Sequence, residues 1–127
     1  MTDYTTKDSG RRQEFSSGAR RDTQAGKPRY DLIPPGPLRR IAELYARGAV
    51  KYGETDGEMN WVKGMPSSRV MGSLLRHVEL YRDGDRTEDH PAAICWNALA
   101  LMFFEGTEFD DLDQVWVVGP RDPKLTP

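Results

Sequence analysis

The sequence predicts an all-α protein of three to four helices, with a flexible arm before them and an extended tail after them. Three stretches carry apolar residues at helical spacing, each between helix-starting and helix-ending residues. The apolar residues are concentrated between Leu32 and Phe104. We therefore expect one helical domain over residues 26–106, between an arm of residues 1–25 and an acidic tail of residues 107–127.

Charge is unevenly distributed, although the net charge is only −2. Residues 1–29 carry seven Lys and Arg against four Asp and Glu, and residues 105–127 carry two against six. A basic arm and an acidic tail on a nearly neutral body do not form the broad basic surface that duplex nucleic acid requires, so we exclude that partner.

Compartment and membrane contact can be judged from three further features. No apolar run approaches the ~20 residues that span a bilayer, and the first residues lack the basic-then-apolar order of a secretion signal. Cys95 is the only cysteine, which excludes an internal disulfide and suits a reducing compartment. We expect a cytoplasmic protein with no membrane partner.

The arm is rich in Ser, Gly, Thr and Arg and has almost no apolar residues, which is typical of disorder or loose docking. The segment that follows, residues 26–35, we call the strap. Its three prolines predict a stiff, extended chain. Lys27, Arg29 and Asp31 alternate along it and so project to one side, as an anion-binding segment requires.

The first helix is predicted over residues 37–52, because Pro37 suits a first turn and Gly53 a C-terminal cap. The second is predicted from Ser67 or Ser68, either of which would serve as its N-cap, to about Asp83.

The third helix is predicted from Asp89 or His90, with Pro91 in its first turn, to about Glu105. It is apolar almost all round, which is typical of a helix buried on every side. Two helices of the same chain can hardly cover it, so we expect a homo-oligomer, a dimer or higher. The run Val115–Val118 is expected to pack as an extended tail.

Two histidines and one amide could contribute to a site. His77 lies at the edge of the second helix's apolar stripe, where a half-buried structural role competes with that of a ligand or general base. His90 is placed to face an anion at a helix start, or to cap the helix. Asn97 should be buried, either bridging helices or lining a pocket that reads a base or sugar.

Carboxylates could bind a metal if the protein is an enzyme. Glu79 and Asp83 project from one side of the second helix, and Glu43 lies on the polar face of the first. Asp89 clusters with Asp85 and Glu88 in the connection before the third. Magnesium takes such oxygen ligands together with substrate phosphates. For each acid alone, an ordinary surface ion pair is the competing interpretation.

Asn60 and Trp61 lie in the loop before the second helix and could hydrogen-bond and stack on a base. An aromatic side chain that anchors a loop to the body is the commoner use of such a residue.

Several motifs in order resemble the N-terminal domain of the dATP/dGTP diphosphohydrolases, a phage-encoded helical family related to MazG-like nucleotide pyrophosphohydrolases. They are the strap, Gly48-Ala-Val-Lys-Tyr-Gly53, Asn60-Trp61 with Lys63-Gly64, Leu75-Arg-His77, and His90 six residues before Trp96-Asn97-Ala98-Leu99. The match covers roughly residues 25–105.

The resemblance implies a MazG-like bundle that hydrolyses a purine deoxynucleoside triphosphate to monophosphate and pyrophosphate, with Mg²⁺ or Mn²⁺, inside an infected bacterium. If the protein catalyses this reaction, we expect three sets of site residues. Glu79, His77 and His90 are the catalytic set; Glu43, Glu79, Asp83 and Asp89 the metal set; and Lys27, Arg29, Lys51, Tyr52, Asn60, Trp61 and Asn97 the substrate-binding set.

Two other functions fit the same sequence. Glu43 and Glu79 lack an acidic partner three residues later, which favours a phage protein that captures a nucleotide or cyclic-nucleotide signal without cleaving it. A small helical assembly module, with purely structural polar residues, is the third hypothesis.

Overall fold

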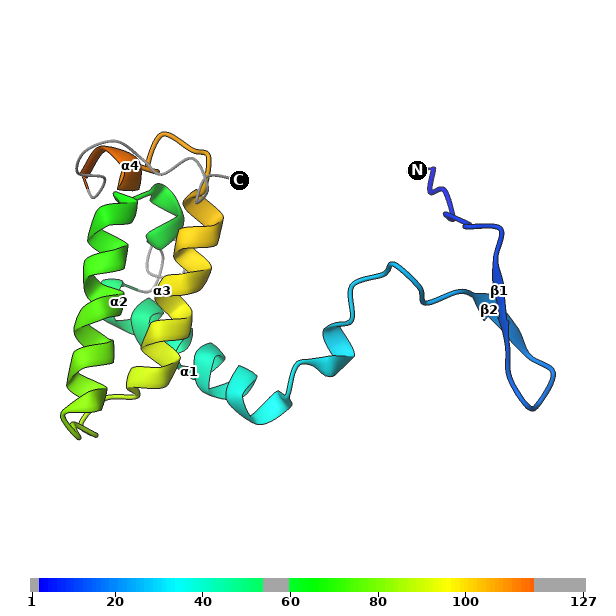
Figure 1. The fold of residues 1–127 in the computed structure, drawn as a ribbon, viewed down its shortest axis with the longest axis horizontal. Helices are drawn as coiled ribbons and strands as arrows, with labels where there is room; N and C mark the ends of the chain where they lie inside the picture. Colours follow the sequence, from blue (N-terminus) through cyan, green and yellow to red (C-terminus); the bar gives the residue numbers. More distant parts are fainter. Residues whose placement is uncertain (1–2, 54–59, 116–127) are drawn as a thin grey trace, which may run out of the picture. The chain divides into compact units, whose positions relative to one another are not determined.

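The computed structural model describes residues 3–53 and 60–115 and is mostly helical (Figure 1), which confirms the all-α prediction. The chain divides into two compact units, residues 1–33 and 34–127. The first contains strands β1 (Arg12–Glu14) and β2 (Arg20–Asp22) and the 3₁₀ helix η1 (Tyr30–Leu32). The second contains α1 (Pro35–Tyr52), the 3₁₀ helix η3 (Trp61–Lys63), α2 (Ser67–Arg82), α3 (His90–Phe104) and α4 (Leu112–Val115).

The first unit contains a small antiparallel hairpin in which Arg12 lies opposite Asp22 and Glu14 opposite Arg20. Opposite charges across a strand pair stabilise the pairing. A flexible arm is predicted here and a hairpin is not, because strands of three mostly exposed residues have no apolar alternation to detect. The strap is also less extended than predicted, since Tyr30–Leu32 form a 3₁₀ turn.

The helices of the second unit lie close to their predicted ranges. α1 begins at Pro35, two residues earlier than expected, because Pro34 is extended and Pro35 can occupy a first helical position where no N–H is needed. α3 begins as predicted, with Asp89 as N-cap accepting a hydrogen bond from the Ala92 N–H.

α2 and α3 pack side by side and form the centre of the second unit (Figure 1). Their buried core consists of Val70, Ala100 and Phe104, each at most 2% exposed. Around this core pack the half-buried side chains of Trp61, Met65, Trp96, Leu101 and Phe109. α1 contacts α3.

Among the described residues, α3 keeps three large exposed apolar side chains. Leu99, Met102 and Phe103 are 40%, 61% and 54% exposed. Cover of this helix by a second subunit therefore stays a prediction. Within the described residues, no helix is long and apolar enough to cross a bilayer.

The start of α2 differs from the prediction, since its N-cap is Pro66 and neither serine caps it. The Ser68 N–H and hydroxyl instead donate to the two carboxylate oxygens of Asp111, at 2.7 and 2.6 Å, and the Ser67 N–H donates to the Phe109 carbonyl at 2.9 Å. Residues next to α4 thus satisfy the free amides that a cap would otherwise take. The hydrogen bonds from Ser68 lower the pKa of the Asp111 carboxyl.

We expect Asp111→Ala to lower the melting temperature near neutral pH, because it removes both acceptors from the start of α2. The depressed pKa means that this stabilisation is present above the ordinary value of 3.8 and is lost as pH falls through the folded pKa. The difference in melting temperature between wild type and variant should therefore shrink in acid. Circular dichroism melts across pH measure it, with the exposed Glu108→Ala as control. An equal difference at all pH values would contradict the assignment.

Candidate functional site

Two buried histidines meet where α2 packs on α3. His77 follows Val70 by two turns on the buried face of α2, and His90 begins a stripe on α3 that continues through Ala93 and Asn97 at spacings of three and four. The Nδ1 atoms of His77 and His90 lie 2.9 Å apart, and the side chains are 7% and 0% exposed. His90 therefore faces its partner ring and not an anion in solvent, because its first-turn position lies on the α2 side of α3.

Glu88 completes a group of three ligand-type side chains. Ligand atoms of His77, Glu88 and His90 all lie within 4.8 Å of one another, and no other such group occurs among residues 3–53 and 60–115. Burial lowers the pKa of His77, the charge of Arg76 acts in the same direction, and Glu88 opposes both. A depressed pKa keeps His77 neutral near pH 7, as metal binding requires.

Asp85 lies behind His90, with its Oδ2 atom 3.6 Å from His90 Nε2. This nitrogen is fully buried and has no hydrogen-bond partner in the described structure. The Thr87 hydroxyl and N–H both donate to Asp85 and are the main reason that the pKa of its carboxyl is lowered. The connection between α2 and α3 thus holds a charged carboxylate beside a buried imidazole edge.

Next to this group is a hollow of about 740 Å³, which we call the arginine hollow. Glu88 belongs to both the hollow and the histidine group. The volume lies within the range of ordinary ligand pockets. The lining residues come from α1, α2, α3 and the connection before α3: Arg40, Leu44, Arg47, Tyr81, Arg86, Thr87, Glu88, Asp89, Pro91 and Ala93.

The three arginines of the hollow are held differently. Arg40 binds Asp89 through two hydrogen bonds, of 3.0 and 2.6 Å, which lower the pKa of that carboxyl and tie α1 to the start of α3. Arg86 lies 4.0 Å from the centre of the Tyr81 ring and donates to the Tyr81 and Asp85 carbonyls. Arg47 has no ion-pair partner among the described residues, so it is the cation most available to an incoming anion.

The four predicted metal-binding acids do not come together. Glu79 forms an exposed ion pair with Arg82, and Asp89 pairs with Arg40 and caps α3. Asp83 ends α2 as its exposed C-cap, and Glu43 is exposed on α1. None of the four belongs to the one ligand group found in the described residues.

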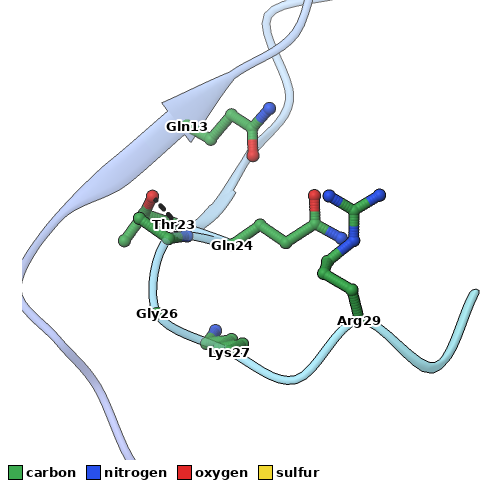
Figure 2. Close-up of a pocket in the computed structure, with 7 residues that line it drawn as sticks. Gln13, Thr23, Gln24, Gly26, Lys27 and Arg29 are labelled. Atoms are coloured by element: carbon green, nitrogen blue, oxygen red, sulfur yellow. Dashed lines mark hydrogen bonds between the residues drawn. The ribbon is translucent and has the colours of Figure 1, made fainter. Parts of the chain in front are cut away.

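Lys27 and Arg29 of the strap lie in the first unit, beside a separate hollow of about 420 Å³ (Figure 2). Lys27 pairs with Asp22 at 3.1 Å and Arg29 with Asp31 at 2.8 Å. Arg29 and Asp31 thus project together as their alternation predicts, and both cations are matched by carboxylates of their own unit. Their predicted contact with a triphosphate remains untested.

The other predicted substrate residues are distributed over the helical unit. Trp61 packs among aromatic rings, with Phe103 at 4.8 Å and Trp96 at 6.2 Å between ring centres, which is the anchoring arrangement. Asn60 precedes it as the N-cap of η3. Lys51 and Tyr52 lie together at the exposed end of α1, with the Lys51 ammonium 5.3 Å from the ring centre.

Asn97 is buried, as predicted, at 4% exposure. Its side-chain amide donates to the Ala93 carbonyl one turn earlier, at 2.7 Å. This bond within the helix satisfies a polar group in the core and favours the structural interpretation of the residue.

A family model described as dATP/dGTP diphosphohydrolase, N-terminal, matches residues 17–112, which is more than half of the chain. The chain belongs to this family. Comparisons with curated proteins and with solved structures gave no significant match. The family match includes both histidines, Glu88 and the whole lining of the arginine hollow.

Both histidines were predicted as site residues, and Asp85 and Glu88 were placed in the group of acids before α3, although only Asp89 of that group was chosen as a metal ligand. The arginines of the hollow were missed. Arg40 and Arg47 are spaced as surface residues of α1, and their convergence with the connection before α3 depends on how α1 packs on α3.

Proposed function

We propose that this protein hydrolyses purine deoxynucleoside triphosphates, dATP or dGTP, to the monophosphate and pyrophosphate in a metal-dependent reaction. Family membership supports the reaction class, since the family is named for dATP/dGTP diphosphohydrolases. The observation that carries the proposal is that Glu88 belongs both to a metal-ligand group and to an arginine-lined hollow. We place the reaction in the cytoplasm, that of a bacterial host if the protein is phage-encoded.

The residues of the histidine group fit a divalent cation, because two neutral imidazoles and a carboxylate are common ligands of catalytic metals. When bound, such an ion neutralises phosphate charge and makes a bound water more acidic. Mg²⁺ or Mn²⁺ is the cofactor that the family resemblance implies for this reaction.

The hollow supplies groups that suit the rest of a nucleotide. Arg47 and Arg86 offer N–H donors to phosphate oxygens, while Asp89 holds Arg40 in a fixed orientation. Leu44 and Pro91 offer apolar surface against a purine. Attack of water at the α-phosphorus forms one P–O bond and breaks the bond to the bridging oxygen, so that pyrophosphate leaves.

We expect Glu88→Gln to reduce the rate of dGTP hydrolysis by at least about 10–100-fold, because it removes a carboxylate from the proposed metal group. Chromatography of monophosphate and pyrophosphate, with Mg²⁺ or Mn²⁺ present, measures the rate. Glu105→Gln is the matched control, since Glu105 is exposed at the end of α3.

Recovery of intact dGTP and dATP from wild-type protein with either metal would contradict hydrolysis. Tight binding without turnover would then support the second hypothesis, a protein that captures a nucleotide or cyclic-nucleotide signal without cleaving it.

Arg47→Ala should raise the KM for dGTP about tenfold or more, with a smaller effect on kcat, because a lost charged hydrogen bond costs about 1.5–3 kcal/mol. Steady-state kinetics measure both constants. Arg39→Ala is the control, since this neighbouring exposed arginine does not line the hollow. Equal effects of the two variants would exclude the arginine hollow as the phosphate site.

We also propose that two copies of the chain associate through the exposed apolar side of α3, where Leu99, Met102 and Phe103 lie. An apolar strip on a helix that is hydrophobic all round is stabilised when a second such strip covers it. Light scattering should give a dimer or larger assembly, and Met102→Lys should shift it toward the monomer. A monomeric wild-type protein at micromolar concentration would refute the proposal.

A further inference from the structure

We infer that the metal ion of this protein is a divalent transition-metal ion, of the Co²⁺ and Zn²⁺ class, bound by His77, Glu88 and His90. This inference rests on the proposed function for what the ion does, but the binding itself can be tested without turnover. It departs from the acidic magnesium site expected from the sequence.

The acids of that expected site do not share a ligand group, and two of them already bind other side chains. Asp89 is the cap of α3 and the partner of Arg40, and Glu79 pairs with Arg82. A hard ion such as Mg²⁺ needs several oxygen ligands in a tight octahedron. The described residues contain one group of three possible ligands within 4.8 Å, and two of its three members are imidazoles.

The donor set indicates the class of ion. Imidazole nitrogen suits Zn²⁺ and Co²⁺ better than Mg²⁺ or Mn²⁺, which prefer oxygen ligands. Two histidines with one glutamate form the ligand set of a catalytic metal with open positions. The two Nδ1 atoms lie 2.9 Å apart, so the imidazoles of α2 and α3 direct a nitrogen to the same place.

Asp85 provides a second, independent indication. A metal-binding histidine usually donates its other N–H to a carboxylate, which fixes the ring and its tautomer. If His90 binds through Nδ1, its Nε2–H points to the side where Asp85 Oδ2 lies, 3.6 Å away. Without an ion, a simple N–H···N bond between the rings would explain the Nδ1 contact, but it would not account for Glu88 beside both rings.

The burial of the group agrees with this assignment. His77 and His90 are 7% and 0% exposed. Glu88, by contrast, is exposed and reaches the group from the hollow side. The group thus combines two buried nitrogen ligands with one carboxylate that also lines the arginine hollow.

Titration of the full-length protein with Co²⁺ tests the inference, because cobalt bound to nitrogen ligands absorbs visible light. We expect a saturable visible band that Zn²⁺ removes and that an excess of Mg²⁺ does not. Glu88→Gln should weaken Co²⁺ binding about 10–100-fold, and His77→Gln should change the shape of the band. Glu105→Gln, an exposed acid outside the group, should bind as wild type does.

Because His77 is buried, its variant must first be shown to melt cooperatively; Glu88→Gln, at an exposed position, tests the same site if it does not. Absence of a cobalt band, or equal binding by wild type and Glu88→Gln, would overturn the inference. Loss of Co²⁺ binding in Glu79→Gln would also overturn it and would favour the predicted acidic ligands instead. Cobalt binding without nucleotide hydrolysis would refute the proposed function alone, and Mg²⁺-supported hydrolysis unaffected by Glu88→Gln would refute this inference alone.

Discussion

The contact between His77 and His90 determines how the working part of this protein is built. Both rings lie on the mutually packed faces of α2 and α3, where a buried polar nitrogen without a partner is costly, and their contact gives the Nδ1 atom of each ring its partner. The pair therefore constrains where the two helices can sit along each other. The short connection between the helices then brings Asp85 and Glu88 beside the rings, so the stability of the interface and the composition of the site depend on one contact.

The large elements could be predicted from sequence because each depends on local information. Helical spacing located three helices, and an aspartate before a proline located the start of α3. The predicted N-cap of α2 was wrong because the carboxylate that accepts the Ser68 N–H belongs to Asp111, 43 residues away in the sequence. No local rule favours that carboxylate over the serine's own hydroxyl. The hairpin was missed for a different reason, since its pairing depends on charge and not on apolar alternation.

The site was only partly predictable for a related reason. His77 and His90 stand out because histidine is uncommon in an apolar stripe, whereas Glu88 and Arg47 look like ordinary surface residues. Their significance comes from the packing of α1 against α3, which closes the arginine hollow beside the connection. Counting acids along helices favoured Glu79 and Asp83, which lie on one side of α2 but face ion-pair partners or solvent.

The arginines around the hollow have two roles. Arg40 and Arg86 bind groups of the protein itself, whereas Arg47 is available to a ligand. Asp89 is committed twice, to Arg40 and to the first free amide of α3, so Arg40 serves mainly to fix α1 in place. Arg86 is likewise committed to the Tyr81 ring and to backbone carbonyls. Arg47 alone of the three keeps its donors uncommitted among the described residues. An anion that enters the hollow thus meets one available guanidinium, that of Arg47, among cations that the protein already orients. Of the two carboxylates that line the hollow, Glu88 is the one that also belongs to the histidine group.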